Sequence, residues 1–209
     1  MSESEHVSTF IKRRMENLSD LVFGLALSIG SVILLAKLPQ TPNDLVTGIA
    51  LFGFSFLIIV LVWSKYTSVM DILPYEIGKT FLLNIVLLFC VALNPYLFYV
   101  LQQSQFSLLN FASSVYALDV GAMVLVLGGL TRLLLGEEKK HGAHKIHPDR
   151  LNRLRQMMIL DVVTGVTFVA SAMPFFWKAV PIGSFLRFDL WYVTVVAFLV
   201  FQHSFRKRK

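Results

Sequence analysis

Hydrophobic residues in this chain gather in long blocks separated by short polar turns, with neither a period-two alternation nor a narrow amphipathic stripe. A helix crosses the hydrocarbon core of a bilayer with about 20 predominantly apolar residues, and six blocks are long enough. The six predicted spans are residues 18–36, 44–63, 80–101, 106–135, 157–176 and 185–205. A membrane barrel would show short alternating segments instead. The pattern therefore predicts an all-α integral membrane protein with six transmembrane helices.

The turns between the blocks carry residues that end or start helices. Pro39 and Pro42 separate the first span from the second, and Asn43 or Asp44 is expected to cap the second. Pro95 lies inside the third span, where its ring should kink the helix.

Domain organisation follows from the shortness of the loops. The one sizeable loop covers residues 136–155, which is too short for a second domain, so residues 1–209 are expected to form one membrane domain. The composition agrees: 56% of the residues are hydrophobic and 15% are charged, against about 25% charged in soluble domains. The single cysteine, Cys90, excludes a disulfide within the chain.

The distribution of positive charge predicts the orientation. Of the 19 lysine and arginine residues, 16 fall on the side that holds both termini and the loop at 136–155. Short cytoplasmic loops carry such an excess, so both termini are expected in the cytoplasm. The net charge of +6 is explained by these loops, and no nucleic-acid partner is predicted.

The entrance of the first span carries the most specific motif in the chain. Arg14 is followed, after three intervening residues, by Leu18, Ser19 and Asp20. Read locally, Ser19 and Asp20 can cap a helix start and Arg14 is ordinary positive charge on the cytoplasmic side. This arrangement at the mouth of the first of six helices resembles the R-x-x-x-F-S-D signature of the transmembrane protein 175 potassium channel family.

The resemblance has departures. Leu18 replaces the family's phenylalanine, and Trp63 at the end of the second span lacks the histidine that often follows. A polar network joining that histidine to the motif cannot be carried over intact, but Tyr66 could supply a hydroxyl instead. We expect Arg14 and Asp20 to pair and to fix the first helix.

The resemblance implies that the first helix lines a pore whose constriction is apolar. Carried over from Asp20, the pore-lining positions are Leu25, Ser28, Ile29 and Val32, which steps of three and four residues place on one helix face. Rings of the apolar side chains would form a neck that closes by dewetting, and Ser28 would offer the one hydroxyl. Gly24 and Ser31 are expected on the opposing face, packed against another helix.

A pore lined by one helix per chain needs several chains. The family implies a homotetramer that conducts potassium ions, with no other cofactor. We expect it in the plasma membrane. Without the resemblance, Leu25, Ile29 and Val32 could equally face lipid or pack in the interior.

Ionisable residues inside spans suggest an alternative function, because such residues are costly and often functional. Asp119 and Asp161 could relay protons or substrate in a transporter or membrane-embedded enzyme, and Asp161 could instead pair with Arg132. Arg187 is expected near the membrane interface as an anchor. No set of catalytic residues and no metal site is predicted, and the loop histidines His141, His144 and His147 are expected to be solvated.

Overall fold

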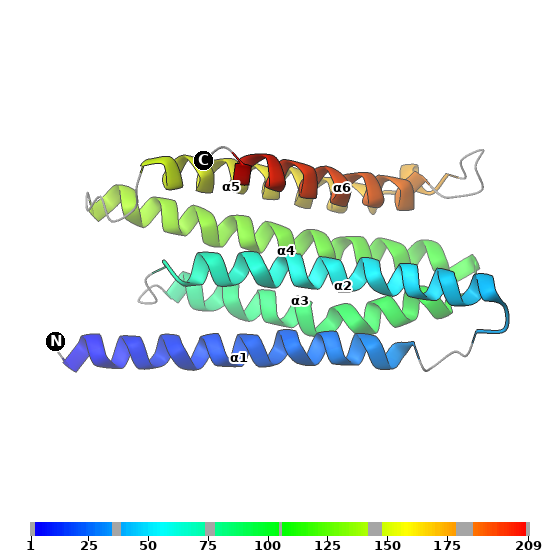
Figure 1. The fold of residues 1–209 in the computed structure, drawn as a ribbon, viewed down its shortest axis with the longest axis horizontal. Coiled ribbons are helices and arrows are strands. Elements are labelled where there is room, and N and C mark those ends of the chain that lie inside the picture. Colours follow the sequence, from blue (N-terminus) through cyan, green and yellow to red (C-terminus); the bar gives the residue numbers. More distant parts are fainter. Residues whose placement is uncertain are drawn as a thin grey trace. The chain divides into compact units, whose positions relative to one another are not determined.

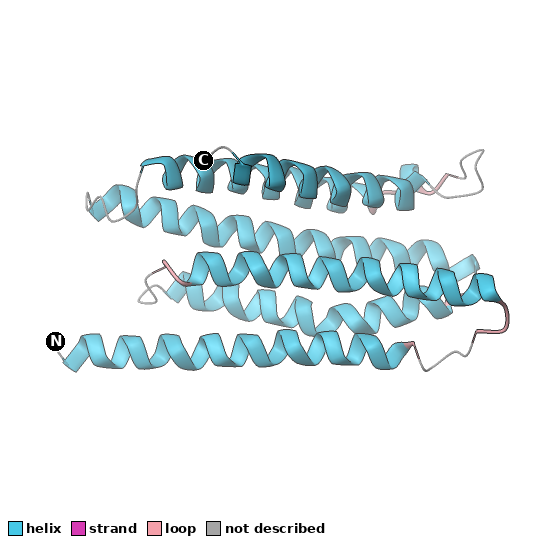
Figure 2. Ribbon diagram, in the orientation of Figure 1, coloured by secondary structure: helices cyan, strands magenta, loops and turns pink. Residues whose placement is uncertain are grey.

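The computed structural model describes residues 3–34, 39–73, 78–104, 106–141, 148–178 and 186–207. Within these ranges the chain is helical and contains no strand (Figures 1 and 2). The elements in order are α1 (Glu3–Ile33), α2 (Pro42–Met70), α3 (Gly78–Gln103), α4 (Phe106–His141), α5 (Pro148–Ser171), the short 3-10 helix η1 (Pro174–Phe176) and α6 (Leu186–Lys207). The predicted all-α fold with six long helices is confirmed.

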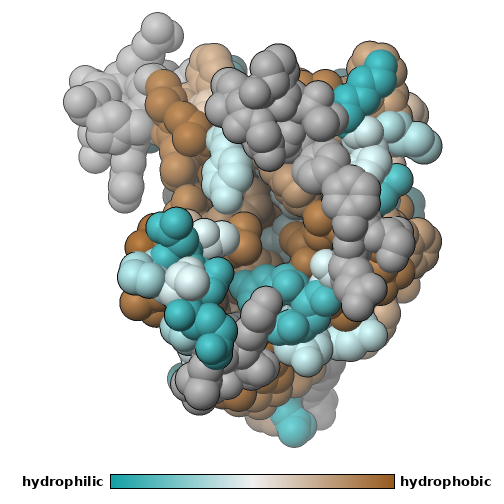
Figure 3. All heavy atoms as spheres, turned by 90° about the vertical axis from the view of Figure 1, so that its right-hand side faces the viewer, coloured by the Kyte–Doolittle hydropathy of each residue, from teal (hydrophilic) through white to brown (hydrophobic). Residues whose placement is uncertain are grey.

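Five of these helices are long and apolar enough, within the described residues, to cross a membrane. The candidate spans are Lys12–Ile33, Pro42–Met70, Gly78–Gln103, Leu108–Lys139 and Leu151–Ser171. Figure 3 shows the end that lies to the right in Figure 1, where hydrophilic residues lie among hydrophobic ones. The chain is a multi-pass membrane protein.

Several helices extend beyond the predicted spans. With 31 residues, α1 is about 46 Å long at 1.5 Å per residue, whereas the hydrocarbon core is about 30 Å thick. Hydropathy marks the part of a helix that lipid covers, and the backbone continues its helix into the polar region beyond.

Two helix ends differ from prediction for local reasons. Thr41, and not Asn43 or Asp44, is the N-cap of α2: its side chain accepts from the Asp44 N–H, and the Asp44 carboxylate accepts from the Thr41 N–H, closing a capping box. The fifth helix ends at Ser171, before the expected 176, because Pro174 holds Met173 in an extended conformation.

The helices form two compact units, Met1–Gln103 and Ser104–Lys209, called unit 1 and unit 2 below. In unit 1, α1 packs mainly on α3 and less extensively on α2. A buried hydrogen bond of 3.1 Å from the Ser55 hydroxyl to the Asn94 side-chain oxygen joins α2 to α3. The α3 helix runs continuously through Pro95, and its ribbon bends along its length (Figure 1).

In unit 2, α4 and α5 make the most extensive helix contact of the structure. Glycines permit it. A Cβ added to Gly121 would lie 2.7 Å from Cγ2 of Val169 and 3.0 Å from the Gly165 carbonyl oxygen, and one added to Gly165 would lie 2.7 Å from Cγ of Leu125. Small residues of this kind let helix backbones approach closely in membranes.

Arg187 fastens α6 to the other helices of unit 2. It was expected at the membrane interface, but its side chain is fully buried. Its Nε, Nη1 and Nη2 atoms donate hydrogen bonds of 2.6–3.2 Å to the end of α5 and the start of α4. The acceptors are the backbone carbonyls of Asn110, Ser171, Ala172 and Met173, the side-chain oxygen of Asn110 and the hydroxyl of Ser113. Carbonyls at a helix C-terminus carry partial negative charge, so they are suitable partners for a buried guanidinium.

The substitution Gly121→Leu should separate α4 from α5. Forcing a side chain into this contact costs roughly 1–3 kcal/mol, and we expect a thermal denaturation midpoint lower by several degrees for the purified protein in detergent. Gly136→Leu on the same helix is the matched control, because nothing lies within 4 Å of a Cβ at Gly136. Equal midpoints for the two variants would contradict the close approach.

Candidate functional site

One face of α1 packs against the rest of unit 1. The buried side chains on this face are Ser19, Phe23, Ala26 and Ile33, each at most 9% exposed. Their separations of three, four and seven residues are those of a single helical face.

The opposite face of α1 is uncovered. Leu25 is 57% exposed, Ile29 44% and Val32 61%. We call this surface the open face of α1, and it consists of Leu18, Leu21, Leu25, Ser28, Ile29 and Val32. All four predicted pore-lining residues lie on it. A continuous apolar stripe on a membrane helix is covered either by lipid or by other protein, such as a further copy of the chain.

The hydroxyls of two serines on the exposed side of α1 donate hydrogen bonds to backbone carbonyls of the same helix. The Ser28 hydroxyl donates a 2.8 Å hydrogen bond to the Gly24 carbonyl, and the Ser31 hydroxyl donates a 2.7 Å bond to the Ser28 carbonyl. The oxygen of Ser28 therefore keeps lone pairs for a cation at the exposed surface. Gly24 and Ser31 were expected in a helix contact, but both are exposed in this chain and no atom lies within 4 Å of a Cβ at Gly24.

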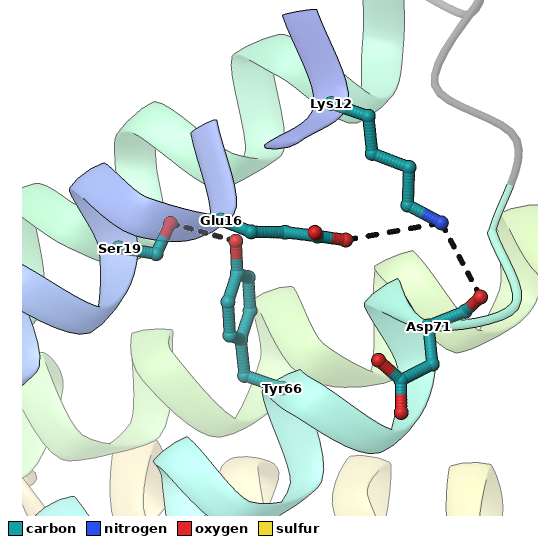
Figure 4. Close-up of polar contacts among 5 residues, drawn as sticks. All are labelled: Lys12, Glu16, Ser19, Tyr66 and Asp71. Atoms are coloured by element: carbon teal, nitrogen blue, oxygen red, sulfur yellow. Dashed lines mark hydrogen bonds and ion pairs between the residues drawn. The ribbon is translucent and has the colours of Figure 1, made fainter. Parts of the chain in front are cut away.

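Ser19 of the motif is hydrogen-bonded inside unit 1. Its hydroxyl donates a 2.8 Å bond to the Met15 carbonyl and lies 2.7 Å from the Tyr66 hydroxyl on α2 (Figure 4). Because the Ser19 proton is used on Met15, Tyr66 is the donor to Ser19. The rings of Phe23 and Tyr66 are 5.7 Å apart. Tyr66 thus supplies the hydroxyl that its position after Trp63 suggested.

Asp20 and Arg14 have partners other than each other. The indole N–H of Trp63 donates a 3.0 Å hydrogen bond to the Asp20 carboxylate. The Arg14 guanidinium lies over the ring of Phe10, 5.5 Å from its centroid. The Asp20–Trp63 bond was missed in the sequence because nothing in the spacing of the two residues signals the contact.

A third contact between α1 and α2 involves Lys12. Its ammonium donates a 3.3 Å hydrogen bond to the carbonyl of Asp71, the C-cap of α2, and lies 3.8 Å from the carboxylate of Glu16 (Figure 4). A cation at a helix C-terminus is favoured by the helix dipole. Lys12, Ser19 and Asp20 thus hold the first half of α1 to the second half of α2.

The predicted intramembrane acids lie in unit 2. Asp119 and Asp161 are buried, whereas Arg132 is exposed. The Asp161 Cβ lies 3.5 Å from a Cβ built on Gly128, nine residues beyond Asp119 on α4. Nine residues of helix rise by about 13 Å, so the two aspartates lie at different levels, too far apart for direct proton exchange.

The described residues contain no group of three or more histidine, cysteine, aspartate or glutamate side chains that could hold a metal ion. The side chains of His141, His144 and His147 lie outside the described residues.

Comparison with known proteins links this geometry to a family. Residues 14–95 match the sequence model described as endosomal/lysosomal potassium channel TMEM175. This region includes the motif, the open face of α1, and Trp63 and Tyr66. No curated protein matches.

Two solved structures share the fold. A lysosomal potassium-selective channel TMEM175 homolog from Chamaesiphon minutus is 20% identical, with a TM-score of 0.62 over 90% of this chain and 96% of that one. A variant of the potassium channel MtTMEM175, crystallised with a nanobody–MBP fusion, is 18% identical, with a TM-score of 0.53 over 93% of this chain and 94% of that one. Residues 14–95 of this chain are therefore similar to the TMEM175 potassium channel family, and the chain shares the fold of the two solved channels.

Proposed function

We propose that four copies of this chain form a potassium-permeable cation channel in which the open face of each α1 lines a shared pore. The observation that carries the proposal is the uncovered apolar face through Leu25, Ile29 and Val32, on a helix whose opposite face is packed. The family match over residues 14–95 covers the whole of this face. Since one chain offers one such helix, a closed ring of chains is needed to surround ions.

The proposed neck works through hydrophobicity and width. Apolar side chains at Leu25, Ile29 and Val32 supply no ligands to a cation, so a narrow ring of them excludes water and stops conduction. When the ring widens, water and ions pass. Ser28, whose oxygen keeps its lone pairs for a cation, would be the polar contact within this stretch.

The motif keeps the open face toward the axis in this proposal. Ser19 and Asp20 bind Tyr66 and Trp63 on α2, and a helix held at two successive residues resists rotation about its own axis. In place of the expected pair of Arg14 and Asp20, Asp20 accepts a hydrogen bond from Trp63. The role of fixing the first helix is retained with different atoms.

Both termini are placed in the cytoplasm in this proposal, and the membrane is the plasma membrane. The support is the concentration of 16 of the 19 lysine and arginine residues on one side of the predicted topology.

The substitution Leu25→Ala should widen the neck. For protein reconstituted in liposomes with a potassium gradient, we expect faster valinomycin-independent potassium flux and a lower ratio of potassium to sodium flux, because a smaller apolar ring hydrates more readily. The matched control is Leu82→Ala on α3, where the leucine is similarly exposed, at 62%. Wild-type liposomes without flux, or identical fluxes for both variants, would rule out the proposed pore.

The mass of the purified complex in mild detergent should be that of four chains plus bound detergent, since a shared axis needs a ring of copies. Light scattering combined with refractive-index detection separates the protein mass from the detergent mass. A monomer that still conducts in liposomes would contradict the arrangement.

The substitution Tyr66→Phe removes the donor to Ser19. A buried hydrogen bond contributes about 0.5–1.5 kcal/mol, so we expect a thermal midpoint lower by a few degrees and a changed flux. Tyr96→Phe on α3 is the control, because this tyrosine is 61% exposed and has no hydrogen bond within the described part of the chain. A change in stability without any change in flux would show that the contact holds the fold but does not position the pore helix.

A further inference from the structure

The attachment of α1 to α2 is uneven along its length. Lys12, Ser19 and Asp20 each make a polar contact with α2. From Leu21 to Ile33, by contrast, no described residue of α1 makes a hydrogen bond or ion pair to another helix. That second half is held by apolar side chains such as Phe23 and Ala26, whose contacts are non-directional and tolerate sliding.

The boundary between the two halves contains residues that favour helix bending. Gly24 has no side chain, and glycine in a helix interior costs about 0.5–1 kcal/mol relative to alanine. The hydroxyl of Ser28 bonds to the carbonyl of Gly24, and that of Ser31 bonds to the carbonyl of Ser28. Such back-bonding serines bend helices, and glycine–serine combinations are a known cause of kinks.

Space is available beside the C-terminal end of α1, beyond the point where Gly30 packs on Phe52. A hollow of about 260 Å³ lies among the end of α1, the start of α2 and the end of α3. Its lining includes Ile33 at the end of α1 and the following Leu34, Leu45 and Gly48 of α2, and Gln102 of α3. Ile33 belongs to the packed face of α1, so the hollow lies on the side away from the open face.

We propose that α1 bends at Gly24–Ser28, so that its second half moves back into this hollow and carries Ile29 and Val32 away from the pore axis. The first half stays fixed to α2 through Lys12, Ser19 and Asp20. This inference rests on the proposed function, since it assumes that the open face of α1 lines the pore. The bend opens the neck, and the straight helix seen here is the closed form.

Filling the hollow tests the bend. In Gly48→Leu the new side chain enters a lining position where no atom lies within 4 Å of a Cβ, so the straight helix is undisturbed. We expect potassium flux into liposomes to fall about tenfold, the effect of a modest shift in a two-state equilibrium. In planar bilayers the open probability should fall while the single-channel conductance stays unchanged, because the neck residues are intact.

Gly53→Leu is the matched control. It lies on the same helix, is equally free of atoms within 4 Å of a Cβ and does not line the hollow, so its open probability should equal that of the wild type. Thermal midpoints of both variants establish that they fold. Gly24→Ala is a second, independent variant: it stiffens the boundary without a clash and should also lower the open probability.

The outcomes separate this inference from the proposed function. If the wild type conducts and Leu25→Ala changes its selectivity, but Gly48→Leu and Gly24→Ala open as often as the wild type, the bend is wrong and the pore remains. If the wild type does not conduct potassium, the proposed channel function and the bend of α1 are both wrong. If Gly48→Leu alters the single-channel conductance in place of the open probability, the hollow belongs to the conduction path, and the bend is again overturned.

Discussion

Polar groups between helices in a membrane have no water to bind, so each needs a partner within the protein, and these partners fix how the helices meet. Within unit 1, Ser19 binds Tyr66 and Asp20 binds Trp63. Within unit 2, Arg187 satisfies carbonyls at the end of α5. Apolar contacts alone would leave helices of this composition free to slide, because lipid tails are as apolar as leucine.

The helices of the two units are held together by different kinds of contact. In unit 2, Gly121 and Gly165 remove side chains from the α4–α5 contact, so the backbones approach and dispersion forces act over a large area. In unit 1, α1 uses fewer close contacts and relies on polar bonds in its first half. This difference agrees with a static role for α4 and α5 and a mobile second half for α1.

The position of the polar bonds also bears on the proposed channel. A pore helix must present one face reliably, yet its constriction must be able to change width. In this chain Ser19 and Asp20 fix the orientation of the helix. The stretch from Gly24 to Val32 makes no polar bonds to neighbouring helices, so the width of the constriction can change. An α1 bonded along its whole length would hold the neck at a single width.

The sequence by itself determined the class of protein, the number of helices and the identity of the motif, because blocks of about 20 apolar residues and their flanking charges are local properties of the chain. It also placed Leu25, Ser28, Ile29 and Val32 on one face of α1, since helical periodicity is local. Only the tertiary structure decided that this face is uncovered, that Asp20 binds Trp63 and not Arg14, and that Arg187 is buried. Asp20 and Trp63 are 43 positions apart in the sequence, and Arg187 binds residues up to 77 positions away. Distances of that kind are set by how helices pack, which no single segment encodes.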